Sequence, residues 1–163
     1  MKTKGVIITG IILAAITIAS FSVWLIPQSI PTRFLVSNAQ EDLDGLLEQQ
    51  KTILEYTGKE FENMINGGIT ADNYINIAEI SHSQINSLII KVIDSEVPSE
   101  WNNSYVALLE SLRSHNSYLM ETIVVAKKLK DNPQADVSSE MSKIGQYLRQ
   151  ADDYLTQSDL ARP

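Results

Sequence analysis

The segment from Trp101 to Leu129, WNNSYVALLESLRSHNSYLMETIVVAKKL, has the most regular helical pattern in the chain. Its apolar side chains recur at steps of three and four residues, which places them on one face of an α-helix. This face comprises Trp101, Tyr105, Leu108, Leu112, His115, Leu119, Ile123, Ala126 and Leu129. Pro98 or Ser99 suits the first helical turn, and Asn132-Pro133 ends the pattern. The segment therefore predicts a long amphipathic helix with one buried face.

Three further segments carry the same periodicity and predict helices over residues 38–66, 70–94 and 136–160. The predicted apolar stripe of the first comprises Leu43, Leu47, Leu54, Phe61 and Ile65, and that of the last comprises Val137, Met141, Ile144, Leu148, Ala151 and Leu155. Ser37 or Asn38 is a suitable N-cap for the first of these helices and Thr70 for the second, and Gly67-Gly68 ends the first. The run from Leu88 to Ile93 is apolar on several sides and would also suit a strand, but its neighbours favour a buried helix end. Four helices with short connections predict an all-α fold, an antiparallel four-helix bundle. Two helical hairpins that pair with a second copy are the alternative.

The N-terminal run from Gly5 to Ile26, GVIITGIILAAITIASFSVWLI, contains no charged side chain. As a helix its 22 residues would cover roughly 33 Å, enough to cross a hydrocarbon core of roughly 30 Å. Lys2 and Lys4 precede it, which predicts a cytoplasmic N-terminus and an extracytoplasmic remainder. The expected organisation is a cytoplasmic N-terminus over residues 1–4, a single-pass plasma-membrane helix over 5–26, a linker over 27–37 and an extracytoplasmic helical bundle over 38–163.

Two other interpretations of the N-terminal run stay open. The small residues Thr17-Ile18-Ala19 would suit cleavage of a secretory signal, although the apolar run continues well past them. The order Lys4-Gly5-Val6 resembles the cleavage site of type IV pilin-like precursors, with Gly10 where many pilins carry a glutamate. Each interpretation sends most of the chain out of the cytoplasm.

Charge and cysteine content exclude several classes of function. All 20 acidic residues follow the apolar run, whereas two of the 13 basic residues precede it, so the exterior part carries a net charge of −9. This balance argues against nucleic-acid binding and against electrostatic contact with anionic lipid. The chain has no cysteine, which excludes disulfides, thiolate metal sites and cysteine catalysis.

Two short motifs are candidate sites. Glu79 and His82 have the Glu-x-x-His spacing that places both groups on one helix face in ferritin-like metal sites. Such a site needs a second pair, and Leu112 stands where His115 would need its glutamate, so Glu79 and His82 are weak metal candidates and no cofactor is expected. Asn102-Asn103-Ser104 is an N-glycosylation sequon at Asn102.

Polar residues also interrupt the predicted apolar faces. These residues are Gln50, Thr57, Ser81, Gln84 and His115. They could line a polar pocket, as in ligand-sensing helical domains. Buried groups that fix the helix register are the favoured interpretation, because no arginine or aromatic cage accompanies them. A pH-sensing role is a further possibility for His115.

Three segments carry a resemblance to a known group of proteins. They are MKTKGVIITGIILAAITIASFSVWLIPQ over residues 1–28, NMINGGITADNYINIAEISHSQINSLI over 63–89 and PSEWNNSYVALLESLRSHNSYLMETIVVA over 98–126. Together they resemble small single-span proteins of ammonia-oxidising archaea. The resemblance implies an outward-facing helical bundle on an archaeal plasma membrane, and it makes an accessory subunit of ammonia monooxygenase conceivable. It supplies no catalytic residues.

No catalytic constellation occurs in the sequence, so we expect a binding or structural protein rather than an enzyme. Gly10, Ala14 and Ala15 are small residues that would let the predicted span pack closely against another helix in lipid. This favours a membrane-protein partner, with a homo-oligomer also possible. The alternatives are a ligand-binding or sensory module that needs a partner to signal, and a pilin-like surface subunit.

Overall fold

The computed structural model describes residues 34–163. The expected cytoplasmic N-terminus, the membrane span and the cleavage sites therefore lie outside the described residues, as do the packing residues Gly10, Ala14 and Ala15. Among the helices that are described, none is both long enough and apolar enough to cross a bilayer.

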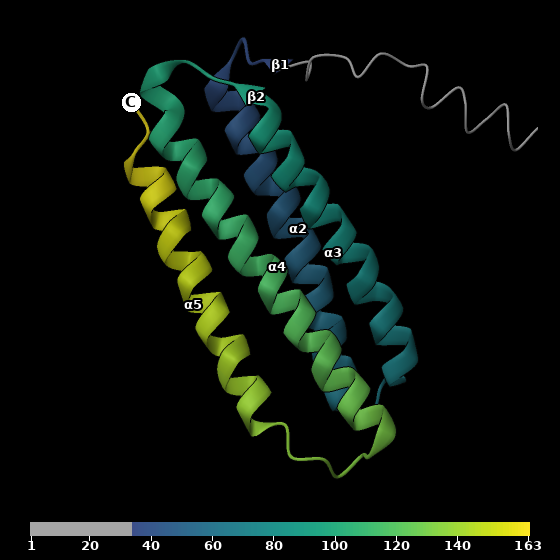
Figure 1. Cartoon of the computed structure of the whole chain (residues 1–163). Helices are drawn as coiled ribbons and strands as arrows, with labels where there is room; N and C mark the ends of the chain where they lie inside the picture. The colour runs from purple at the N-terminus through teal and green to yellow at the C-terminus, as the bar shows by residue number, and fades with distance from the viewer. Residues whose placement is uncertain (1–33) are drawn as a thin grey trace, which may run out of the picture. The chain divides into compact units, whose positions relative to one another are not determined.

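Four helices packed against each other make up the domain, which confirms the prediction of an all-α, bundle-like fold (Figure 1). They are α2 (Ala39–Ile65), α3 (Ala71–Asp94), α4 (Asn102–Asp131) and α5 (Ser138–Leu160). Successive helices run in opposite directions. The predicted caps begin two of them: Asn38 Oδ1 accepts the Glu41 backbone N–H at 3.2 Å, and Thr70 Oγ1 accepts that of Asn73 at 3.2 Å. These bonds satisfy donors that a helix start leaves without an intrahelical partner.

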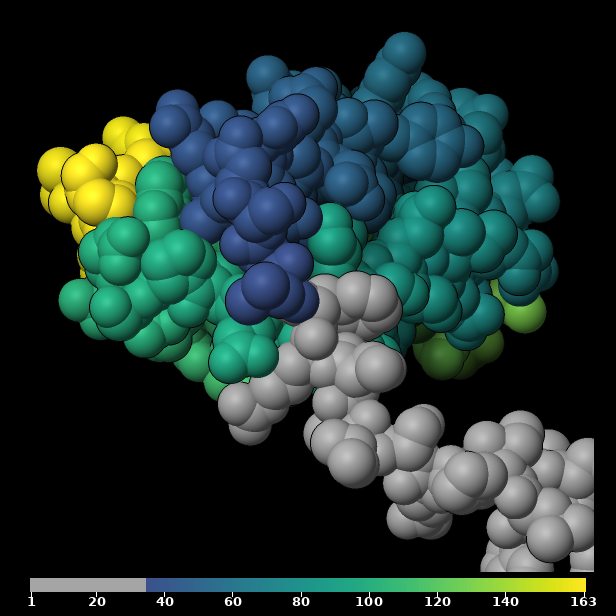
Figure 2. All heavy atoms as spheres, turned by 90° about the horizontal axis from the view of Figure 1, so that it is seen from above, coloured from purple at the N-terminus to yellow at the C-terminus, as the bar shows by residue number. Residues whose placement is uncertain are grey.

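Two very short strands join the start of the domain to the connection between α3 and α4. Strand β1 (Phe34–Leu35) pairs in parallel with β2 (Ser95–Glu96), with Phe34 opposite Ser95. The Val36 N–H extends the pairing by donating to the Glu96 carbonyl at 3.0 Å. The 3₁₀ turn η1 (Ser99–Trp101) then leads into α4. Figure 2 views the end of the bundle at which α2 begins and α5 ends.

Helix α4 is the most buried helix and contacts both α3 and α5 closely. Leu108, Leu112 and Leu119 have no exposed surface. Small side chains on the same helix let the neighbouring backbones approach, because interaxial distance depends on the side chains at the contact. At one such point Ser104 and Ser158 exchange hydrogen bonds, each hydroxyl donating to the other residue's carbonyl at 2.6 and 2.9 Å. The buried face of α4 also includes Ser104, Ser111 and Thr122, so it is wider than the predicted apolar stripe.

Helices α2 and α5 each pack mainly against one neighbour. Helix α2 packs mainly against α3, and α5 packs mainly against α4. On α5 the buried apolar positions are Ile144 and Ala151. Leu148 and Leu155, predicted as core residues, are only half-buried, and Met141 is 42% exposed. The apolar stripe of α5 is therefore only partly covered by α4.

Candidate functional site: a groove between α2 and α5

The five polar residues predicted to face the core do not form one pocket. The Thr57 and Ser81 hydroxyl oxygens lie 2.7 Å apart between α2 and α3, whereas Gln50 contacts His115 between α2 and α4. Gln84 is exposed on α3. Two separate buried polar pairs are present in place of a single pocket, because Gln50 and Thr57 lie about two helical turns apart along α2.

A groove of about 310 Å³ separates α2 from α5. Leu47 and Leu54 line it from α2, and Leu155 lines it from α5. Gln50 and His115 line the same groove between these leucines. Both are nearly inaccessible to solvent, with exposed fractions of 2% and 4%. The groove thus combines apolar walls with a polar floor.

A second hollow of about 450 Å³ continues the groove toward the other end of the bundle and shares Leu54 with the first. Its apolar lining includes Phe61, Tyr118 and Leu148. Together the two hollows form a trough between α2 and α5, which we call the α2–α5 groove. Its length along α2, from Leu47 to Ile65, is roughly 27 Å for 18 helical steps.

The polar floor of the groove has a defined hydrogen-bonding arrangement. Gln50 Nε2 lies 2.6 Å from His115 Nδ1 and donates to Ser111 Oγ at 3.1 Å. With Nδ1 as the acceptor, the ring proton of His115 lies on Nε2. Burial lowers the pKa of His115 from 6.5 to about 4, and a hydrogen bond to the Ser111 backbone opposes this shift only in part. The imidazole is therefore neutral at pH 7.

The Gln50 side chain is left with one unused group. Its Oε1 atom is buried and has no hydrogen-bond partner among residues 34–163. Exchanging the amide oxygen and nitrogen would reverse the bond to His115, but it would leave the other amide atom unpartnered instead. A buried polar atom without a partner costs free energy, so the Gln50 amide is only partly satisfied by His115 and Ser111.

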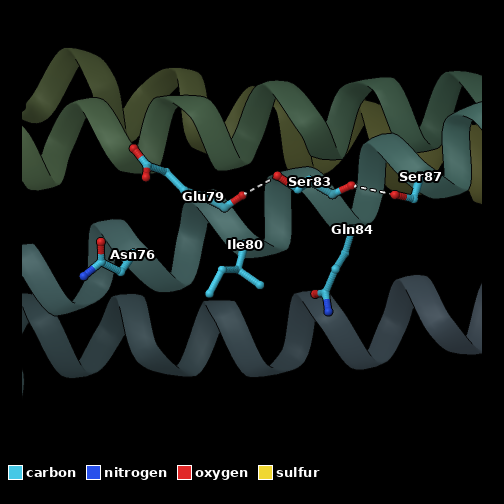
Figure 3. Close-up of a pocket in the computed structure, with 6 residues that line it drawn as sticks. All are labelled: Asn76, Glu79, Ile80, Ser83, Gln84 and Ser87. Carbon is cyan, nitrogen blue, oxygen red and sulfur yellow. Dashed lines mark hydrogen bonds between the residues drawn. The ribbon is translucent and has the colours of Figure 1, made fainter. Parts of the chain in front are cut away.

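The weak metal candidates occupy a different surface. Glu79 belongs to a shallow groove of about 540 Å³ on the outer side of α3 (Figure 3), and His82 Nδ1 lies 3.3 Å from Asn86 Nδ2. Ser83 and Ser87, which line the Glu79 groove, donate their hydroxyl protons to α3 carbonyls at 3.0 Å. Within residues 34–163, no three histidine or acidic side chains are grouped so that they could hold a metal ion.

The sequon residue Asn102 is the first residue of α4 and is exposed. It follows η1 at the end of the bundle where α2 begins. The side-chain amide is therefore on the surface, as a glycosylation acceptor has to be.

Sequence reasoning identified Gln50 and His115 as polar residues on apolar faces but did not pair them. It also missed Ser111, which is fully buried and completes the contact. The four groove leucines, Leu47, Leu54, Leu148 and Leu155, were assigned to apolar helix faces from their periodicity. A partial signal was present: Leu47 and Leu54, like Leu148 and Leu155, are seven residues apart, which is the spacing of a seam between helices.

Comparisons of the chain with protein-family models, with curated proteins and with solved structures found no match. The resemblance to proteins of ammonia-oxidising archaea therefore stays a prediction. Evidence on function comes from the chain's own residues, above all from the N-terminal apolar run and the α2–α5 groove.

Proposed function

We propose that this chain is a membrane-tethered, non-catalytic interaction protein, an extracytoplasmic helical domain that binds or braces a subunit of a membrane protein complex. The observation that carries the proposal is the α2–α5 groove, in which leucines of two helices remain only half-buried. Half-buried apolar ridges on a small domain favour a protein-binding surface. The uncharged run of residues 5–26 supplies the tether.

The chemistry of the groove also favours binding over catalysis. His115 is the titratable group on its floor, and its neighbours there are an amide and a hydroxyl rather than a nucleophile with a base. A neutral imidazole bonded to an amide has no carboxylate to orient it for proton transfer. These residues are suited to hydrogen bonding with a bound group.

The partner class follows from where the tether would hold the domain. If residues 5–26 span the membrane, the seven residues 27–33 would reach about 25 Å at most, because an extended chain covers about 3.5 Å per residue. The domain would then stay near the bilayer surface, where the exposed part of a membrane protein is the available partner. The family resemblance makes ammonia monooxygenase the first complex to examine.

The test is purification of the tagged full-length chain from gently solubilised native membranes, with mass spectrometry of its mature N-terminus and of the co-purifying chains. We expect an uncleaved N-terminus and at least one membrane subunit in stoichiometric amount. Recovery of the chain alone, or cleavage after Ala19 or after Gly5, would overturn the proposal. Of these outcomes, cleavage between Gly5 and Val6 would favour the pilin-like alternative.

A further inference from the structure

The geometry points to a specific occupant of the α2–α5 groove: an amphipathic α-helix of the partner that is apolar on one face and has basic residues beside that face. This inference rests on the proposed function and names the chemistry of the partner. It depends on three features of the groove, which are its apolar ridges, its bordering charges and its polar floor.

The ridges match the packing requirements of a helix. Leu47 and Leu54 on α2, and Leu148 and Leu155 on α5, are each two helical turns apart. They line the two sides of the α2–α5 groove, whose two hollows share Leu54. A helix can place its side chains between such rows, as knobs enter holes in a coiled coil. A trough of roughly 27 Å accommodates a helix of about 18 residues, far longer than a small ligand.

The charges beside the groove select a basic partner. Glu55, Glu62 and Asp152 line it, against the single cation Lys51. Lys51 lies 3.9 Å from Glu55, and Glu62 and Asp152 have no ion-pair partner within the described part of the chain. Complementary charge speeds association and excludes partners of the same sign. Lysine or arginine beside the apolar face would therefore be favoured, and glutamate would be disfavoured.

The floor adds a positional requirement on the partner. With Nδ1 accepting from Gln50, His115 Nε2 carries the ring proton and can donate it to a group bound in the groove. If the Gln50 amide is reversed, Nε2 is an acceptor instead. A serine, threonine, asparagine or glutamine side chain has both complementary groups. The partner helix should therefore carry one such residue in its apolar face, near Leu54 and Leu155.

The first experiment measures peptide binding to the full-length chain in nonionic detergent micelles by fluorescence anisotropy. The probes are two helical peptides of about 18 residues with the same leucine face and one central glutamine. One has lysines beside that face, and the other has glutamates. We expect the lysine peptide to bind at least about tenfold more tightly. Equal binding of both peptides, or no binding of either, would overturn the inference.

Two sets of variants locate the binding. Leu148→Glu places a charge in the groove and should weaken binding of the lysine peptide at least about tenfold. Ile80→Glu, on the outer face of α3, is the matched control and should leave affinity unchanged. The exposed pair Glu62→Lys and Asp152→Lys keeps the leucines in place and should reverse the preference toward the glutamate peptide. Because these two side chains are exposed, this double variant remains informative if Leu148→Glu fails to fold.

Self-association gives a distinguishable result. If sedimentation shows a dimer that Leu148→Glu converts to a monomer, the groove holds a second copy of this chain and the inference fails. The failure of the inference is also separable from that of the proposed function. If a membrane subunit still co-purifies with the Leu148→Glu variant from native membranes, the proposed function as an interaction protein stands. The α2–α5 groove is then excluded as the surface that binds this subunit.

Discussion

The buried imidazole of His115 predicts that stability falls between neutral and mildly acidic pH. His115 is 4% exposed, and burial lowers its pKa from 6.5 to about 4. Below about pH 6.5 the His115 imidazole is therefore protonated in the unfolded chain but stays neutral in the folded chain until the pH approaches 4. Because the folded pKa is the lower one, the stabilising contribution is fully present above pH 6.5 and is lost progressively as the pH falls to about 4.

The magnitude follows from the difference between the two pKa values. A difference of about 2.5 units corresponds to about 3 kcal/mol, since each unit is worth about 1.4 kcal/mol. That is a large fraction of a typical stability of about 5–15 kcal/mol. The Lys128 ammonium beside Glu140 holds the pKa of that carboxyl below its usual 4.5, so Glu140 titrates below most of this window.

The assay is urea unfolding of the full-length chain in nonionic detergent at several pH values from 7 to 4. Trp101 fluorescence reports unfolding, with Trp24→Phe as the common background. Between pH 7 and pH 4 the parent should lose about 3 kcal/mol more than a His115→Gln variant. His82→Gln controls for the loss of a histidine elsewhere. The reasoning is refuted if the free energy of unfolding falls equally with pH in the parent and in His115→Gln. It is also refuted if NMR shows that the His115 ring titrates near pH 6.5.

The other predictions concern packing and capping, and urea unfolding at pH 7 checks each of them. Leu112→Ala empties a fully buried site and should cost about 2–5 kcal/mol, whereas Val106→Ala, at a side chain 58% exposed, should change stability by less than about 0.5 kcal/mol. Ser104→Leu should cost at least about 1–3 kcal/mol, because it forces α4 away from Ser158; a neutral result would mean that the contact can relax. Thr70→Ala should cost about 1 kcal/mol by removing the cap of α3, and Thr70→Ser should restore most of it.

The helices were largely predictable because their signals are local. Thr70 caps α3 as the sequence indicated, and Asn38, one of the two residues it offered, caps α2. The apolar run up to Ile93 is helical, as its neighbours favoured. Capping depends on hydrogen bonds within one turn, so a few adjacent residues are enough to predict it. Periodicity likewise identifies the apolar face of a helix from its own sequence.

The site was predictable only in part because it depends on which helices become neighbours. Gln50 and His115 are 65 positions apart, and no pattern within either helix shows that they meet. Periodicity also gave Leu148 and Leu155 the same status as Ile144 and Ala151, although only the second pair is buried. A stripe predicts an apolar face without telling how much of that face a neighbour covers.

The sequence by itself predicted the four helices of the described domain, the caps of α2 and α3, the helix breaks and the absence of cysteine chemistry, and it leads us to expect a tether over residues 5–26. Only the tertiary structure decided that α4 is the central helix, that Gln50 meets His115, and that the leucines of α2 and α5 border an open groove. The physical reason is that small residues of α4, such as Ser104, allow a close approach of α5. The distance between two helices is set jointly by residues of both, and it appears in neither helix's own pattern.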